Sequence, residues 1–438
     1  MHRRLHPMQA ADRTAGGGTP PWFGAGMSHI WLPYAQMKIA GDPLPVVATQ
    51  GSRILLADGR ELIDGVASWW TACHGYNHPH IVDAVRRQLD AMPHVMFGGL
   101  VHERALTLAC RLSALMPKGL DRVFFSDSGS VSVEIALKMA VQYWLNKGEP
   151  RRTRFVAFKG SYHGDTTGAM AVSDPVESMH RAFAGLLPRQ FSCNLPANET
   201  AVAMLERLLD RRAAEIAGII VEPLVQGAGG MRFHDADVLR RLRAIADRYH
   251  LLLIFDEIFT GFGRTGTMFA AQAAGVTPDI VTLSKALTGG TLPLAATIAR
   301  RNVFDAFWSD DPIHALMHGP TYMANALACA AANASLDLFE AEPRLQQVEA
   351  IAAALERGLA PCRDLPGVKD VRAKGAIGVV EFDRIDDLDG LRAQFVDEGV
   401  FVRPFGSIVY LTPAFTVTEE DLATLMRAIV KVLRSRAS

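Results

Sequence analysis

Residues 251–257 read LLLIFDE, and residues 282–290 read TLSKALTGG. Each apolar run leads to an ionisable side chain, Asp256 in the first and Lys285, 29 residues later, in the second. Short runs without polar alternation are typical of strands that are buried on both faces of a parallel sheet. The carboxyl ends of parallel strands share one edge of the sheet, where open α/β sheets bind ligands. We therefore expect Asp256 and Lys285 to emerge together at this edge.

The same alternation of apolar runs and helical patterns continues through the chain beyond Met27. Buried strands are predicted at residues 122–125, 153–158 and 216–221, and a helix is predicted to begin near Val131. This order predicts an α/β fold, in which a parallel or mostly parallel sheet carries helices on both faces.

The C-terminal part has a different pattern. A helical pattern runs from residue 334 to 359, and apolar runs follow at residues 375–382, 399–404 and 407–411 before a final helix. This order predicts a smaller α+β domain. The predicted organisation is a disordered tail at residues 1–27, a first segment of the small domain at 28–75, a large domain at 76–333 and the rest of the small domain at 334–438.

The tail prediction rests on composition. Residues 1–27 hold three arginines, a single acid and Gly-rich and Pro-rich stretches, which cannot build a core. A transit peptide is the alternative, although this stretch lacks serine and its amphipathic pattern is weak.

Composition also narrows the class of protein. The 45 Lys and Arg balance the 46 Asp and Glu, so no net field attracts nucleic acid or anionic membrane. No apolar run reaches the roughly 18 residues that a membrane span needs. The five cysteines are odd in number and show no CxxC spacing, so neither a metal site nor a disulfide framework is indicated. We expect small-molecule partners and a reducing cytoplasm.

A candidate phosphate site precedes the first clear helix of the large domain. Residues 126–130 read SDSGS and lie between the strand that ends at Phe125 and the helix that follows. Small residues there expose backbone N–H groups, and the helix dipole favours an anion. Gly129 and Ser130 are the predicted phosphate ligands. The alternative is an ordinary serine-rich helix cap.

Lys285, Asp256 and the phosphate loop together predict one cofactor. A lysine amine can form a Schiff base with a carbonyl compound, and a carboxylate stabilises a protonated ring nitrogen. These needs match pyridoxal 5'-phosphate (PLP), with its aldehyde on Lys285 and its ring nitrogen facing Asp256. The alternative for Lys285 is a surface lysine near a turn.

A family resemblance covers nearly the whole chain from His29 onward. Five of its motifs resemble those of the class III aminotransferases of PLP fold type I. These motifs are VEP at 221–223, QGAGGM at 226–231, FDEI at 255–258, TGFGRTG at 260–266 and SKALTGG at 284–290. The resemblance implies a seven-stranded, mostly parallel sheet in the large domain. It also implies a ping-pong transaminase that is a homodimer with shared active sites.

The resemblance assigns cofactor contacts residue by residue. Tyr162 would stack on the pyridine face, and Asp165 and Glu222 would lie around the ring. Pro320 and Thr321 would approach the phosphate from the other subunit. An ordinary core aromatic is the alternative for Tyr162.

Further segments resemble the branch of the family that serves biotin synthesis, namely residues 30–34, 68–70, 94–100 and 318–323. This resemblance implies S-adenosyl-L-methionine as amino donor and 8-amino-7-oxononanoate as acceptor. Lys285 would move the proton, with Asp256 and Tyr34 as the other catalytic residues. Arg403 would hold the acceptor's distal carboxylate through a bidentate fork. The residues expected to contact substrate are Tyr34, Trp69, Trp70, Tyr162, Lys285, Gly319 and Arg403.

The chain departs from the family pattern at three positions. Phe259 stands where alanine is usual, Leu32 replaces a histidine and Ala326 replaces a proline. Phe259 adds bulk close to Asp256, where it either tightens the pocket or repacks the sheet.

Several interpretations stay open at this point. The tryptophan pair is alternatively core or interface, and Arg403 is alternatively a surface ion-pair partner. For the whole chain, the alternatives are another class III ω-aminotransferase, a lysine-dependent synthase of the same product, and a PLP-binding protein without turnover.

Overall fold

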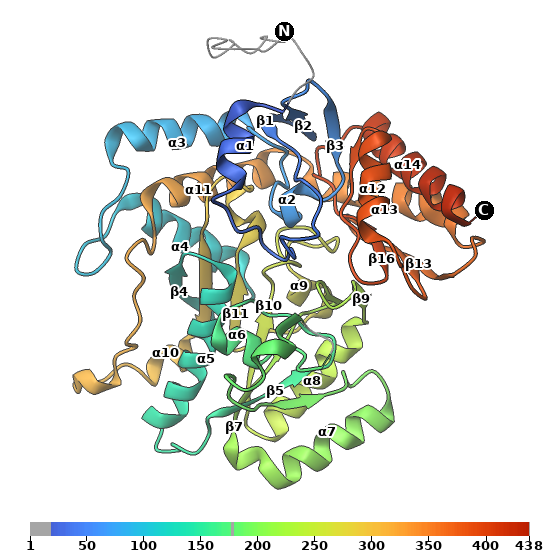
Figure 1. The fold of residues 1–438 in the computed structure, drawn as a ribbon. Coiled ribbons are helices and arrows are strands. Elements are labelled where there is room, and N and C mark those ends of the chain that lie inside the picture. The colour runs from blue at the N-terminus through green and yellow to red at the C-terminus, as the bar shows by residue number, and fades with distance from the viewer. Residues whose placement is uncertain (1–18, 177–178, 438) are drawn as a thin grey trace.

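A computed structural model describes residues 19–176 and 179–437. Its centre is a seven-stranded sheet with helices on both faces (Figure 1). The order across the sheet is β4 (Leu120–Ser126), β12 (Ala295–Arg300), β11 (Ile280–Leu283), β10 (Leu252–Asp256), β7 (Ile216–Val221), β5 (Arg154–Phe158) and β6 (Phe191–Cys193). Only β12 runs antiparallel to its neighbours within this sheet. The prediction of a mostly parallel α/β sheet is confirmed.

The central strands are buried on both faces, as their uninterrupted apolar sequence predicts. In β10, Leu252 and Ile254 pack on the side of α5, whereas Leu253 and Phe255 pack on the opposite side, in a separate core cluster. This alternation follows from the two-residue period of a strand. The helices around this sheet are α3 (Pro79–Ala91), α4 (Glu103–Leu115), α5 (Gly129–Asn146), α6 (Thr167–Ala171), α7 (Glu199–Arg212), α8 (Ala236–Arg248), α9 (Ala270–Ala274), α10 (Arg301–Asp305) and α11 (Ala326–Ala341).

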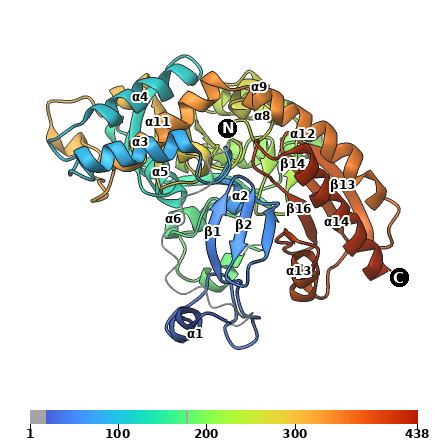
Figure 2. The same cartoon turned by 90° about the horizontal axis from the view of Figure 1, so that it is seen from above.

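A second region joins the two ends of the chain. Strand β3 pairs in parallel with β15, so the N-terminal strands and the C-terminal part lie side by side (Figure 2). The first sheet consists of β1 (Val46–Gln50), β2 (Arg53–Leu56), β3 (Glu61–Asp64) and β15 (Val400–Phe401). A three-stranded antiparallel sheet consists of β13 (Val368–Lys374), β14 (Ile377–Phe382) and β16 (Ile408–Leu411). The helices of this second region are α12 (Arg344–Leu359), α13 (Leu388–Asp397) and α14 (Glu419–Ala437). A separate two-stranded antiparallel ribbon pairs β8 (Val225–Gln226) with β9 (Arg232–Phe233).

The structure corrects two predicted element boundaries, whereas the predicted domain boundary stays a prediction. The helical pattern at residues 334–359 is the end of α11 plus α12, which are separated at Glu342 and Pro343. A proline cannot donate to the preceding turn, so the helix breaks there. The predicted domain boundary after residue 333 falls inside α11. The predicted strand at 399–404 is paired only over β15.

The predicted tail is only partly within the described residues. Residues 21–27 form a short helix, α1 (Pro21–Met27), which buries none of its side chains. The disordered tail predicted for residues 1–27 is therefore wrong for this part, where Pro21 supplies a fixed φ at the first helical position. Residues 1–18 lie outside the described residues. Within the described part of the chain, no helix is both long and apolar enough to cross a membrane.

Candidate active site

Asp256 and the segment that carries Lys285 meet at the carboxyl edge of the large sheet. Asp256, at the end of β10, is in register with Thr282 of the neighbouring parallel strand β11. Its buried carboxylate accepts hydrogen bonds from the Ile258 N–H at 3.1 Å and the Thr282 hydroxyl at 3.3 Å. His163 Nδ1 lies 2.7 Å from the other carboxylate oxygen. The carboxylate is therefore held in one orientation.

Lys285 begins a short 3-10 helix, η3 (Lys285–Thr288), directly after β11. Its φ of 48° lies in the left-handed region, which is costly for a residue with a Cβ. Its Nζ lies 5.0 Å from the centroid of the Trp70 ring. Burial lowers the pKa of the amine, although the nearby carboxylate of Asp256 acts in the opposite direction. Lys285 is thus a largely buried lysine packed against Trp70 and not a surface lysine near a turn.

The predicted phosphate loop lies at the N-terminus of the 18-residue helix α5. The hydroxyl of Ser128 caps this helix by accepting from the Val131 N–H at 3.3 Å. Gly129 packs so closely on Ile258 that a Cβ there would lie 3.0 Å from the Ile258 side chain. The helix N-terminus is thereby held against Ile258, the second residue after β10.

Tyr162 and Asp165 follow β5 and belong to a compact polar cluster. The Asp165 carboxylate accepts from the Tyr162 hydroxyl at 2.9 Å and from the Tyr34 hydroxyl at 2.5 Å. His180 Nε2 lies 2.9 Å from the same carboxylate and its ring stacks on Tyr162, with centroids 5.5 Å apart. The hydrogen bond to His180, more than any other contact, lowers the pKa of Asp165 to about 2. Asp165 therefore ties the N-terminal segment to the tyrosine ring.

Glu222, directly after β7, accepts hydrogen bonds from two backbone N–H groups of this region. One carboxylate oxygen accepts from the Tyr162 N–H at 2.9 Å and the other from the Gly227 N–H at 2.8 Å. Burial raises the pKa of this carboxyl group to about 7. Glu222 thus fixes where the Tyr162 backbone and the glycine-rich segment lie.

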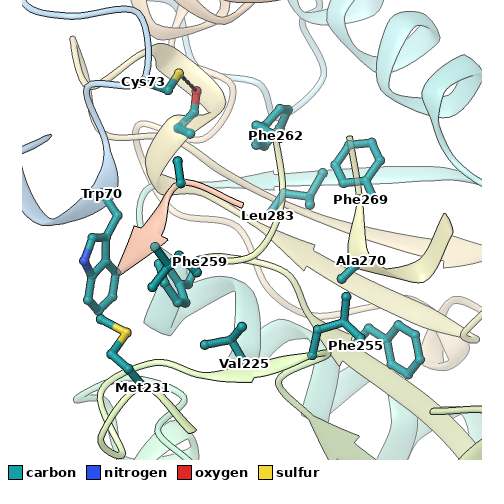
Figure 3. Packing of buried hydrophobic residues seen from close by; sticks show 14 of the residues in the cluster. Trp70, Cys73, Val225, Met231, Phe255, Phe259, Phe262, Phe269, Ala270 and Leu283 are labelled. Carbon is teal, nitrogen blue, oxygen red and sulfur yellow. Dashed lines mark hydrogen bonds between the residues drawn. The ribbon is translucent and has the colours of Figure 1, made fainter. Parts of the chain in front are cut away.

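The two adjacent tryptophans occupy different environments. Trp69 is 41% exposed, whereas Trp70 is 8% exposed and packs on Phe259 with ring centroids 4.2 Å apart (Figure 3). Phe259 is itself buried, and a Cβ on Gly227 would lie 2.8 Å from its ring. The unusual Phe259 therefore repacks the core beneath Trp70.

Arg403 lies at the mouth of the site. Its guanidinium stacks over Trp69, 4.8 Å from the ring centroid, and burial lowers its pKa. Trp69 also meets Tyr34 edge to face at 6.0 Å. Within the described residues no carboxylate forms an ion pair with Arg403, which argues against the alternative of a structural ion pair. A half-buried cation of this kind suits an anionic ligand.

The structure does not bring Gly319, Pro320 and Thr321 into this group. They lie on the exposed stretch before α11, where the Tyr322 ring meets His94 at 4.6 Å. The described contacts of this stretch are with residues 94–102, β4 and α5, and none of them reaches Lys285.

Sequence reasoning missed two histidines. His163 stands beside the predicted Tyr162, but nothing in the sequence shows that it would face Asp256, which lies 93 residues further along the chain. His180 lies in a segment without a motif. The only sequence signal for His163 is its position beside Tyr162, a predicted cofactor residue, in a chain that also has a predicted buried aspartate.

The geometry fits pyridoxal phosphate. The buried amine of Lys285 suits its aldehyde, the oriented carboxylate of Asp256 suits a protonated ring nitrogen, and the N-terminus of α5 suits a phosphate. A free nitrogen supports this fit: His163 Nε2 is buried and has no hydrogen-bond partner among the described residues. His163 thus keeps one nitrogen without a partner beside Asp256.

Comparison with known proteins gives concordant results. The family model for class III aminotransferases matches residues 37–433. A protein of Mycobacterium leprae named adenosylmethionine-8-amino-7-oxononanoate aminotransferase is 45% identical over 95% of this chain and 98% of its own length. A protein of the same name from Buchnera aphidicola (subspecies Schizaphis graminum) is 42% identical over 92% of this chain and 95% of its own.

Solved structures agree with this assignment. The crystal structure of adenosylmethionine-8-amino-7-oxononanoate aminotransferase from Methanocaldococcus jannaschii is 30% identical, with a TM-score of 0.89 over 94% of this chain and 98% of that chain. An amine transaminase from an uncultivated Pseudomonas species, in its PLP-bound form, is 34% identical, with a TM-score of 0.85 over 94% of this chain and 99% of that one.

Proposed function

This chain belongs to the class III aminotransferase family, and we propose that it transfers an amino group from S-adenosyl-L-methionine to 8-amino-7-oxononanoate. The product would be 7,8-diaminononanoate, an intermediate of biotin synthesis. Relatives from several bacteria that share 38–45% of their residues with this chain carry the name of this activity. The observation that carries the proposal is that the amine of Lys285 and the oriented carboxylate of Asp256 follow neighbouring strands, while Trp70 and Trp69 link this centre to Arg403, which has no ion-pair partner among the described residues.

The family cofactor, PLP, supplies an aldehyde that takes up an amino group and a ring that stores an electron pair. Gly129, Ser130 and the N-terminus of α5 would hold its phosphate. Tyr162 would cover one face of the ring. Glu222 would act indirectly, because its carboxylate is used to fix the Tyr162 backbone.

Lys285 is proposed as the group that binds the cofactor and then moves a proton as general acid and base. A free lysine is almost fully protonated at neutral pH, so it must lose its charge to act as a nucleophile. Burial next to Trp70 lowers the pKa of Lys285 and favours the neutral amine. Asp256, locked by His163 and Thr282, would keep a proton on the ring nitrogen.

Recognition of the acceptor would depend on the mouth of the site. The acceptor carries a carboxylate at the far end of an aliphatic chain. Arg403 would bind that carboxylate, and the exposed Trp69 would line the aliphatic part. Tyr34 would close the site on the side of Trp69, where a hydrogen bond from its hydroxyl to the Asp165 carboxylate holds it. Trp70 would contact the Lys285 end of the ligand and not the mouth.

A homodimer is part of the proposal. Large apolar side chains are exposed on the N-terminal segment and on residues 308–322, including Trp31, Ile39, Trp308, Ile313 and Met317. Exposed apolar area of this kind is typical of protein interfaces. Pro320 and Thr321 of the partner subunit would then reach the cofactor phosphate, with Gly319 beside the substrate.

We also propose a cytoplasmic location, which the five free cysteines support.

The donor half-reaction tests the assignment. The cofactor-loaded protein is mixed separately with S-adenosyl-L-methionine and with lysine, and the visible absorbance of the bound cofactor is followed. We expect loss of absorbance with S-adenosyl-L-methionine. Loss with lysine alone would show a lysine-dependent synthase, and loss only with other amines would show a different ω-aminotransferase. A protein that reacts with no amine and does not rescue biotin-requiring growth would be a PLP-binding protein without turnover.

A further inference from the structure

The exposed Trp69 lies within a left-handed turn. Four consecutive residues without glycine, from Ala67 to Trp70, have φ values of 46°, 47°, 54° and 73°. Chirality disfavours this conformation in every one of them, and only glycine adopts it freely. The turn, α2 (Ala67–Trp70), closes through hydrogen bonds from the Trp70 N–H to the Val66 carbonyl and from the Thr71 N–H to the Ala67 carbonyl, both 2.9 Å. A run of this kind persists only where its surroundings hold it.

Two polar side chains, one buried and one partly buried, hold this turn. The Asp64 carboxylate accepts from the Val66 N–H at 2.8 Å with one oxygen and from the Ser68 N–H at 3.0 Å with the other. The Tyr76 hydroxyl donates to Asp64 at 2.5 Å, which leaves its oxygen to accept from the Ser68 hydroxyl at 2.6 Å. Asp64 is almost fully buried. The network thus satisfies the N–H groups of Val66 and Ser68 at the start of the turn.

The turn directs its two indoles to two different cations. Trp70 lies under the Lys285 amine at 5.0 Å, and Trp69 lies under the Arg403 guanidinium at 4.8 Å. The residues that follow the turn pack against the segment that carries Lys285, because a Cβ on Gly290 would lie 2.9 Å from the Ala72 nitrogen and from the Thr71 hydroxyl. One short segment therefore contacts both ends of the proposed substrate site.

We propose that Asp64 and Tyr76 are positioning residues that hold the turn at Ala67–Trp70 and so fix the distance between the Lys285 end and the Arg403 end of the site. They touch no reacting atom and act through the two indoles. The turn sets which length of substrate fits between the amine and the guanidinium. For the identity of that substrate the inference rests on the proposed function.

Tyr76→Phe tests this proposal, because it removes one hydroxyl and keeps the ring. Tyr249→Phe is the matched control, since that hydroxyl also donates to a carboxylate, Asp210 of α7, at 2.7 Å, and Tyr249 directly follows α8, outside the turn and its network. In the cofactor-loaded protein we expect Tyr76→Phe to speed amide hydrogen exchange of residues 64–72 about tenfold, which corresponds to about 1.4 kcal/mol. Loss of a hydrogen bond to a charged group is of this size.

Two further readouts report on the function of the turn. In Tyr76→Phe the KM for the acceptor should rise about fivefold, while kcat and the KM for the donor change less than about twofold. The pH midpoint of the visible absorbance of the bound cofactor should move from the wild-type value, because Trp70 contacts Lys285. Ser68→Ala removes the second hydroxyl from an exposed side chain and should act in the same direction with a smaller effect.

The outcomes separate the two proposals. Unchanged exchange of residues 64–72, or an unchanged absorbance midpoint in both variants, would overturn the positioning role. An equal rise of both KM values, or an equal change in Tyr249→Phe, would also overturn it. If the wild-type protein does not use the acceptor at all, the proposed function fails. Exchange and absorbance, which need no substrate, then still decide the positioning role.

Discussion

The two ends of the site are built differently. The strand-end centre comprises Asp256, His163 and Thr282, which are buried at the edge of one sheet, and Lys285, which is partly buried beside them. The mouth cluster, which comprises Tyr34, Trp69 and Arg403, joins three segments that are far apart in the chain and all partly exposed. In the strand-end centre, neighbouring strands fix the position of each group. In the mouth cluster, the pairing of β3 with β15 brings two of the segments together, and side-chain contacts join the three residues at their ends.

This difference suggests a division of labour. Chemistry needs groups held within a fraction of an ångström, and parallel strands with a shared hydrogen-bond register provide that. Recognition of one substrate among several needs contacts that can change without disturbing the sheet, and surface segments provide those. We expect substitutions in the strand-end centre to lower kcat, and substitutions in the mouth cluster to raise the KM for one substrate.

Lys285→Ala should have the largest effect. Removal of the amine eliminates both the cofactor attachment and the proton carrier, so turnover should fall by about 10⁴-fold or more. The melting temperature of the protein should stay near the wild-type value. Steady-state rates and thermal unfolding check this, with Lys431→Ala as the control, because that lysine pairs with Glu398 on the surface. Measurable transamination in Lys285→Ala would refute the assigned role.

Asp256→Asn should have the next largest effect. A carboxylate at about 4 Å contributes up to about 4 kcal/mol to a protonated ring nitrogen at an effective dielectric near 20, so kcat should fall about 10²- to 10³-fold. Asp279→Asn is the matched control: this buried aspartate lies at the opposite end of the sheet, where it accepts from the Leu253 N–H and pairs with Arg243.

We expect Asp279→Asn to lower the free energy of unfolding by about 1.5–3 kcal/mol and to leave kcat unchanged. A comparable loss of kcat in both variants would mean that the effect of Asp256 comes through the fold and not through the cofactor.

Arg403→Ala should act on one substrate only. Loss of a charge-assisted contact costs about 1.5–3 kcal/mol, so the KM for the carboxylate-bearing acceptor should rise roughly 10- to 100-fold. The KM for the donor serves as the internal control. If both values rise equally, Arg403 holds the mouth cluster together and does not select the acceptor.

The smallest effect concerns pH and stability. Because burial lowers the pKa of Lys285, its charged form destabilises the folded cofactor-free protein. That penalty is fully present below the lowered folded pKa and is relieved as the pH rises toward the unfolded value near 10.5. The stability gain of Lys285→Met over wild type should therefore shrink with rising pH. Urea unfolding at a series of pH values measures it, and a gain that grows with pH would contradict the assigned burial.

Sequence patterns located the strand-end centre better than the mouth cluster. Asp256 ends an apolar run, and apolar runs of this length form buried strands, so its place at the sheet edge could be predicted. The partner of Asp256 could not, because His163 is brought to it only by the order of strands β5, β7 and β10. Likewise the adjacent Trp69 and Trp70 were expected to share one role, but the left-handed turn separates them.

The sequence by itself determined the α/β class, the strand ends that carry Asp256 and Lys285, and the helix N-terminus beside Gly129. These features depend on local periodicity and on residues that are neighbours in the chain. Only the tertiary structure decided that Tyr34 closes on Asp165, that Phe259 supports Trp70 and that Asp64 and Tyr76 hold a turn in an unfavourable conformation. The physical reason is that these contacts join residues from different segments, and local propensity does not record which segments pack together.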